Sequence, residues 1–115
     1  MINLDIFNKL QEIGGPRFVN KIIDLFFEHM PEKVQTITNA LQIRDLVSLE
    51  RTAHSMKSSS ANLGLEHLQG LCARLEIKAR EQNLAECSLL VPDILASYQQ
   101  ATQILLDKKK ELEAA

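Results

Sequence analysis

Apolar residues recur every three or four positions along nearly the whole chain, and this spacing restricts the chain to helical structure. One such run comprises Leu90, Ile94, Tyr98, Ala101 and Leu105. Residues at this spacing share one face of an α-helix. No stretch of any length alternates apolar and polar residues as a half-buried strand would. The sequence therefore predicts an all-α protein.

Glycine and proline divide the first part of the chain into helical segments. We predict a short helix over about residues 4–11, ended by Gly14 and Gly15. Pro16 suits the first position of a second helix, which we expect to end or kink at Pro31. A separate segment is then predicted over residues 32–42.

The second part of the chain contains three further predicted helices. Asp45 is a good N-cap for a helix that ends near Leu63, where Gly64 resembles a C-cap glycine. The next helix carries the apolar positions between residues 68 and 79, and a turn at Asn83 precedes the last helix. Pro92 falls in that last helix, either in an early turn or at a kink.

Four long amphipathic units joined by short connections favour an antiparallel four-helix bundle, with the short N-terminal helix capping one end. A length of 115 residues suits one domain with one core. We predict a single domain over residues 1–115, with the bundle core over about 16–110.

The composition argues against several classes of function. The net charge is -2, and scattered lysines and arginines form no basic stripe for nucleic acid. No apolar segment approaches the roughly 20 residues that cross a bilayer. Cys72 and Cys87 lie among apolar residues, which indicates core positions, and no metal-ligand spacing is present. We expect a cytoplasmic monomer without a metal or cofactor of its own, without nucleic-acid binding and without direct membrane contact.

The stretch "AHSMKSSSANLG" places a histidine beside a lysine and several small residues. Projection of residues 46–63 at about 100° per residue puts His54 roughly 130° from the middle of the apolar stripe, so it points outward. Its neighbours on that face are Lys57, Ser58 and Ala61. Ser60 lies on the core side. The small residues thus provide clearance on both sides of the helix.

An exposed imidazole is partly uncharged and nucleophilic near neutral pH, because its ordinary pKa is about 6.5. A lysine one turn away favours that neutral form and could contact an anion attached to the ring. Small flanking residues would let a partner approach the histidine. Taken alone, however, a histidine and lysine at this spacing also fit an ordinary solvated surface.

The longer stretch "AHSMKSSSANLGLEHLQGLCARLE" resembles the signature of histidine-containing phosphotransfer (HPt) domains of bacterial phosphorelays. The segments "LDIFNKLQEIGG" and "FVNKIIDLFFEHMP" resemble the N-terminal part of such domains, so the resemblance covers nearly the whole chain. Ser58 departs from the pattern, since many members have glycine there. The matching positions are Ala53, His54, Met56, Lys57, Ser59, Leu63 and Gly64.

The resemblance implies a role for each of four residues. His54 would be phosphorylated on the ring nitrogen farther from the backbone, and Lys57 would orient and partly neutralise the phosphoryl group. Glu76 matches a position near the histidine ring where the family has Gln or Glu, although an ordinary solvated glutamate fits equally well. Arg80 could contact an acidic receiver surface or be a solvated arginine.

The resemblance also implies a phosphocarrier function. A response-regulator receiver domain would pass its phosphoryl group to His54, which would pass it to another receiver; Mg²⁺ would belong to the receiver. The sequence contains no ATP-binding loop, so we expect no kinase activity. The rival interpretation is a helical interaction or dimerisation module without phosphotransfer. The N-terminal pattern also resembles HPt segments of hybrid sensor kinases, in which a parent chain could tether the domain to the inner membrane.

A receiver would also need an apolar anchor near the histidine, because small residues supply little apolar area. The short N-terminal helix is more apolar than a simple cap requires, and by resemblance it lies beside the histidine. We predict that part of it forms an exposed receiver-binding patch; the alternative is that its apolar residues belong to the core. The patch residues are Ile6, Leu10, Ile13 and Phe18.

Overall fold

The computed structural model describes residues 2–114, and these residues form an all-α structure without strands. The four helices are α1 (Leu4–Ile43), α2 (Leu46–Asn62), α3 (Glu66–Arg80) and α4 (Leu84–Ala114). The all-α prediction is therefore confirmed. Met1 and Ala115, the outermost residues of the predicted domain, lie outside the described part.

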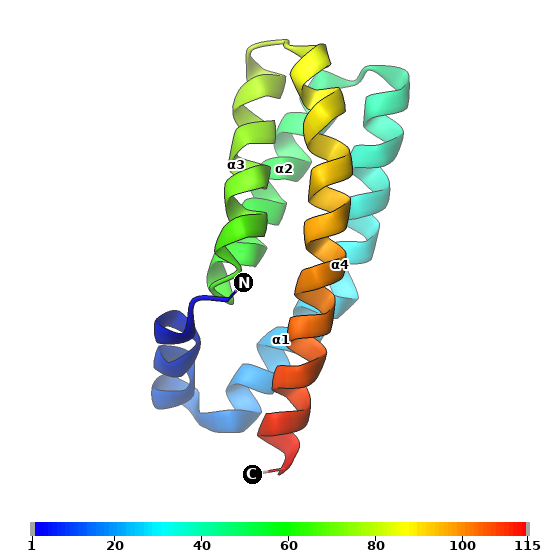
Figure 1. Cartoon of the computed structure of the whole chain (residues 1–115). Helices are drawn as coiled ribbons and strands as arrows, with labels where there is room; N and C mark the ends of the chain where they lie inside the picture. The colour runs from blue at the N-terminus through cyan, green and yellow to red at the C-terminus, as the bar shows by residue number, and fades with distance from the viewer. Residues whose placement is uncertain (1, 115) are drawn as a thin grey trace.

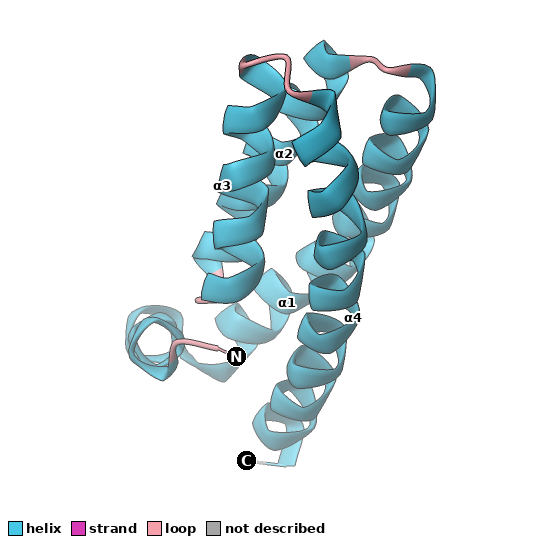
Figure 2. Cartoon of the chain, turned by 45° about the horizontal axis from the view of Figure 1, so that its top comes forward, coloured by secondary structure: helices cyan, strands magenta, loops and turns pink. Residues whose placement is uncertain are grey.

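The long helices run alternately up and down, as an antiparallel four-helix bundle requires (Figure 1). Each helix packs against two others, because α2 contacts α1 and α3, while α4 contacts α3 and α1. The connections are only a few residues long, which forces sequential helices to be antiparallel neighbours. The first turns of α1 are directed away from the bundle axis and lie at one end of the bundle, as the tilted view in Figure 2 also shows.

The backbone at Gly15 separates this N-terminal segment, residues 4–14, from the rest of α1. Gly15 has φ 77° and ψ -179°, a conformation that is open to glycine and costly for other residues. Pro16 follows and starts the long part of α1, so the predicted break between the two helices is confirmed. Phe7 anchors the segment in the core, and the Lys108 ammonium lies 5.6 Å from the centre of its ring.

The prediction that Pro31 ends the second helix is wrong, because α1 continues through it to Ile43. Residues 32–42 belong to this same helix rather than to a separate segment. Proline in a helix interior costs about 3 kcal/mol. Met30 and Ile37 are completely buried on either side of it, and burying a large apolar side chain contributes about 1.5–3 kcal/mol. Packing of the continuous helix therefore offsets the cost of the proline.

The helix ends follow the predicted N-cap at Asp45, C-cap glycine at Gly64 and turn at Asn83. The Asp45 carboxylate accepts a hydrogen bond from the Ser48 amide at 3.1 Å, and Asn83 caps α4 by accepting from the Glu86 amide at 3.1 Å. Gly64 has φ 71° and lies against the backbone oxygen of Asn3, so a side chain at this position would be strained and crowded. Pro92 lies inside α4 and not in its first turn.

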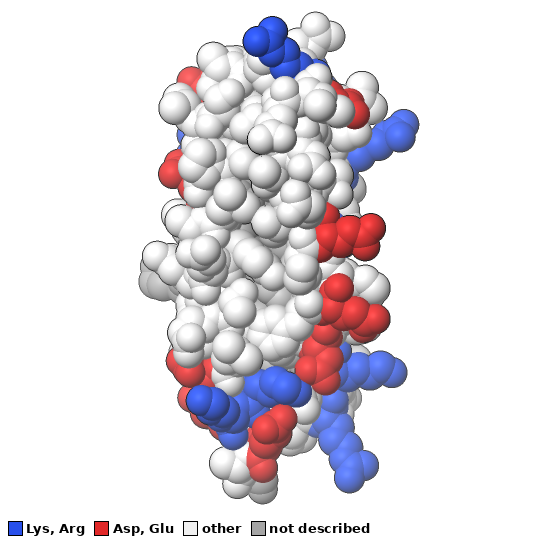
Figure 3. All heavy atoms as spheres, turned by 90° about the vertical axis from the view of Figure 1, so that its right-hand side faces the viewer, with Lys and Arg blue, Asp and Glu red and all other residues white. Residues whose placement is uncertain are grey.

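The core is continuous along the bundle and contains both cysteines, Cys72 and Cys87, as predicted. None of the helices in residues 2–114 is long and apolar enough to span a membrane. The outer face of α1 and α4 carries few charged side chains along its middle, and they gather at its edge and lower end (Figure 3). The charged groups that surround His54 instead belong to α2 and α3.

Candidate functional site

His54 lies on the outer face of α2, and its side chain is 62% exposed. The neighbouring positions Ala53 and Met56 are completely buried, so the apolar stripe of α2 fixes the rotation of the helix. The exposure predicted from the helical projection is confirmed. An imidazole in this position can be reached by a partner without any change in the bundle.

Glu76 of α3 lies beneath the imidazole. Its Oε2 is 2.8 Å from Nδ1 of His54, and its Oε1 accepts a hydrogen bond from the Lys57 ammonium at 2.6 Å. The Glu76 side chain is only 10% exposed, so the alternative that it is a solvated glutamate is wrong. The tightly packed contact between α2 and α3 brings these three residues together.

The electrostatics keep the Glu76 carboxylate ionised. The hydrogen bond from Lys57 lowers the pKa of Glu76 and outweighs the opposing effect of burial, and the hydrogen bond from His54 lowers it further. An ionised carboxylate only accepts hydrogen bonds, so Nδ1 of His54 must be the donor. A neutral imidazole that carries its proton on Nδ1 has its lone pair on Nε2, the nitrogen farther from the backbone.

Arg80 adds a second cation to Glu76. Its Nη2 lies 3.2 Å from Oε2 of Glu76, one helical turn away, and its Nε donates to Glu50 of α2 at 3.1 Å. The Arg80 side chain is nevertheless 60% exposed. Sequence reasoning identified Arg80 but missed Glu50, although its position four residues before His54 places it on the same face of α2.

The small residues around His54 lie as the helical projection predicts. Ser58 is exposed, and Ala61 is half-buried. Ser60 is completely buried and donates its hydroxyl hydrogen to the Met56 carbonyl at 2.8 Å. The outer surface of α2 on the C-terminal side of the histidine therefore carries small side chains at Ser58 and Ala61, which leave room for a partner.

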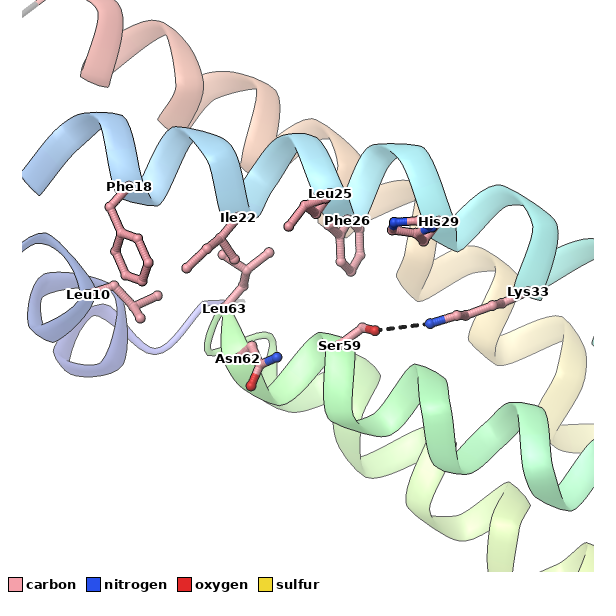
Figure 4. A pocket seen from close by; sticks show the side chains of 10 residues that line it. All are labelled: Leu10, Phe18, Ile22, Leu25, Phe26, His29, Lys33, Ser59, Asn62 and Leu63. Carbon is pink, nitrogen blue, oxygen red and sulfur yellow. Dashed lines mark hydrogen bonds between the residues drawn. The ribbon is translucent and has the colours of Figure 1, made fainter. Parts of the chain in front are cut away.

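An apolar groove of about 390 Å³ opens between the N-terminal segment, α1 and α2. Figure 4 shows Leu10 and Phe18 facing each other at one end, with Lys33 and Ser59 at the other. The Lys33 ammonium donates to the Ser59 hydroxyl at 3.3 Å. The complete lining comprises Leu10, Phe18, Ile22, Leu25, Phe26, His29, Lys33, Ser59, Asn62 and Leu63.

The four residues of the predicted patch lie in three different environments. Leu10 and Phe18 line the groove, and Phe18 is 38% exposed. Ile13 is 75% exposed on the N-terminal segment, outside the groove. Ile6 is half-buried near Gly64. The alternative that all four residues belong to the core is therefore wrong. Sequence reasoning did not identify Ile22 and Leu25 as groove residues, because their spacing also fits a core stripe.

Comparisons with known proteins agree on one family. Residues 21–107 match the sequence model of the Hpt domain family. The chain is 27% identical over 100 residues to the phosphorelay protein LuxU of Vibrio harveyi, a match that covers 83% of this chain and 88% of LuxU. It is 26% identical over 93 residues to histidine-containing phosphotransfer protein 2 of Arabidopsis thaliana, covering 78% of this chain and 60% of the plant protein. The chain thus spans about three fifths of the length of that relative.

A solved structure shows the same arrangement of helices. The crystal structure of histidine-containing phosphotransfer protein B from Pseudomonas aeruginosa has a TM-score of 0.90 with this chain at 25% sequence identity. The superposition covers 96% of this chain and 95% of the Pseudomonas chain. The similarity of the bundle and the match of the Hpt family model to most of the chain indicate the same family. This protein belongs to the Hpt domain family.

Proposed function

We propose that this protein is a phosphocarrier of a multistep phosphorelay, with His54 as the residue that holds the phosphoryl group. One observation carries the proposal: the buried Glu76 carboxylate binds Nδ1 of His54 at 2.8 Å and leaves Nε2 on an exposed face. Membership of the Hpt domain family and similarity to phosphorelay proteins support the same function.

In the proposed reaction, the Nε2 lone pair attacks the phosphorus of a receiver's phosphoaspartate. The Nε2–P bond forms as the bond between phosphorus and the aspartyl oxygen breaks, and the aspartate leaves as a carboxylate. No proton has to move, because the Nδ1 proton stays in its hydrogen bond to Glu76. The ring gains positive charge, and the Glu76 carboxylate stabilises that charge. The reverse sequence delivers the phosphoryl group to the next receiver.

Lys57 would act mainly through Glu76 in this scheme, because its ammonium already binds that carboxylate. It can also turn toward a phosphoryl group on the neighbouring ring, since its side chain is 31% exposed. We propose no metal or cofactor for this chain. Mg²⁺ on the receiver would neutralise the charge of the transferring group.

The receiver would dock across the apolar groove. Ser59 and Asn62 of the groove lie five and eight residues after His54, which places them about 8–12 Å along the axis of α2. The exposed Ser58 lies between them and the histidine. A partner that brings its aspartate to His54 can therefore also cover Leu10, Phe18 and, on the N-terminal segment, Ile13.

A transfer assay tests the proposal against the alternative of a helical interaction module. The protein is incubated with a phosphorylated receiver and then examined for acid-labile, base-stable label. We expect label on the wild type and on His67→Gln, a matched change of another exposed histidine, but not on His54→Gln. A wild-type protein that binds the receiver and stays unlabelled would establish the interaction module instead.

A further inference from the structure

A hollow of about 210 Å³ lies directly beside His54, separate from the apolar groove. Its lining residues are Glu50, Arg51, His54 and Glu76. Side chains on a helix lean toward the N-terminus, so the imidazole lies over the turn of α2 that contains Glu50 and Arg51. A phosphoryl group on Nε2 would therefore lie close to this hollow.

The two carboxylates of the hollow are already neutralised by other residues. Arg80 binds both Glu50 and Glu76, and Lys57 binds Glu76 as well. Arg51 differs from these cations, because within residues 2–114 its guanidinium has no ion-pair partner. It is exposed, three residues before His54, on the edge of the hollow.

We propose that Arg51 contacts the phosphoryl group on His54 and stabilises it during transfer. This inference rests on the proposed function, since it assigns a further residue to the same reaction. A guanidinium offers several donors in a planar fork that matches phosphate oxygens, and such charge-assisted hydrogen bonds are strong. Lys57 and Arg80 would keep Glu76 in place, while Arg51 binds the incoming group.

The charges around the ring support this assignment. With a neutral imidazole, the charged groups around the ring are the cations Lys57, Arg51 and Arg80 and the carboxylates Glu50 and Glu76, which leaves one net positive charge. Transfer adds one net negative charge, because the ring becomes cationic and the bound phosphoryl group carries two negative charges. Arg51 therefore allows the phosphorylated site to be neutral. Without it, the phosphorylated site would carry a net negative charge, which opposes transfer.

The test uses phosphoramidate, a small phosphoryl donor, so that receiver docking plays no part. The Nε2–P bond forms, the P–N bond of phosphoramidate breaks, and ammonia leaves. The rate of His54 phosphorylation is compared among the wild type, Arg51→Ala and Arg51→Lys. Arg74→Ala is the matched control, because Arg74 is an exposed arginine of α3 outside the hollow.

We expect Arg51→Ala to slow phosphorylation roughly tenfold, as loss of one hydrogen bond to a charged group would, and Arg51→Lys to recover part of the rate. The ³¹P chemical shift of the phosphoprotein should change in Arg51→Ala and not in Arg74→Ala. A wild-type rate and an unchanged chemical shift in Arg51→Ala would overturn the role of Arg51 while leaving the proposed function intact. A wild-type protein that gains no phosphoryl group on His54 would overturn both.

Discussion

Nδ1 of His54 and Oε2 of Glu76 lie 2.8 Å apart, so a carboxylate from one helix selects the tautomer of an imidazole on the next. The carboxylate is buried and the imidazole is exposed. The relationship turns a surface histidine, which would otherwise exchange its proton between two nitrogens, into one with a defined free lone pair. In the proposed reaction, the reactivity of His54 would therefore depend on Glu76, which does not touch the phosphoryl group.

Glu76→Ala should reduce the rate of phosphoryl transfer to His54 by roughly 10–100-fold, because it removes a hydrogen bond to a charged group. Glu76→Gln should lose less, since its amide oxygen still accepts from Nδ1 but does not stabilise a cationic ring. Single-turnover rates with saturating phosphoreceiver measure both effects. Equal rates for the wild type and both variants would mean that Glu76 does not position the histidine.

The stability of the protein should depend on pH through the same carboxylate. The hydrogen bond from Lys57 is the largest cause of the lowered pKa of Glu76. A carboxyl group whose pKa is lower in the folded state stabilises the fold above its ordinary pKa, and this contribution is lost as the pH falls through the lowered value. The unfolding free energy of the wild type should therefore decrease relative to that of Glu76→Gln as the pH falls below about 4. Urea unfolding at several pH values measures it, and a difference that stays constant from pH 7 to pH 3 would contradict the assignment.

Lys57→Ala should slow transfer without weakening receiver binding, because the nucleophile and the docking surface are unchanged. If Lys57 acts through Glu76, the two residues belong to one network and their effects are not additive. We expect the variant Lys57→Ala/Glu76→Gln to transfer no more slowly than the slower single variant. Additive losses of rate would show that Lys57 works independently of Glu76, by direct contact with the phosphoryl group.

The docking surface can be tested with pairs of exposed residues that match in type. Leu25→Asp changes the groove, and Leu89→Asp changes a leucine of α4 outside it. Ile13→Asp changes the N-terminal segment, and Ile43→Asp changes a similarly exposed isoleucine at the far end of α1. Leu25→Asp and Ile13→Asp should weaken receiver binding roughly tenfold or more, since a central apolar contact contributes more than about 1 kcal/mol.

All four variants should keep the melting temperature nearly unchanged, because the substituted side chains are exposed. Binding is measured by calorimetry or by titration with labelled receiver. Equal affinities for all four variants would place the docking surface elsewhere. A large drop in melting temperature for Leu25→Asp would instead assign that residue to the core.

The helical class, the bundle and most helix ends could be predicted from the sequence because they depend on local signals. A residue at a helix end acts on the backbone atoms next to it in the sequence. Residue type and position were therefore sufficient to predict the helix ends at Asp45, Gly64 and Asn83. The predicted helix end at Pro31 was wrong, because the sequence shows the local cost of proline but not the compensating burial of Met30 and Ile37. Arg44 and Gln82 adopt left-handed conformations that sequence reasoning did not anticipate, because neither is glycine.

The candidate site could be predicted in part for the same reason. The exposure of His54 and its neighbours on α2 follows from the period of a single helix. The contacts of Glu76 with His54 and Lys57 depend on the register between α2 and α3, which no local pattern specifies. Glu50 was missed because its ion pair with Arg80 of α3 depends on the same register. The hollow that Arg51 lines could not be predicted either, because it also includes Glu76 of α3.

The most direct test of the account is to identify the atom that carries the phosphoryl group. The protein is phosphorylated by a phosphoreceiver, and the site is determined by ³¹P and ¹⁵N NMR of the intact, folded phosphoprotein. We predict a single phosphorus bonded to Nε2 of His54, with the proton on Nδ1 still hydrogen-bonded to Glu76. A phosphoryl group on Nδ1, on another residue, or on none would contradict it.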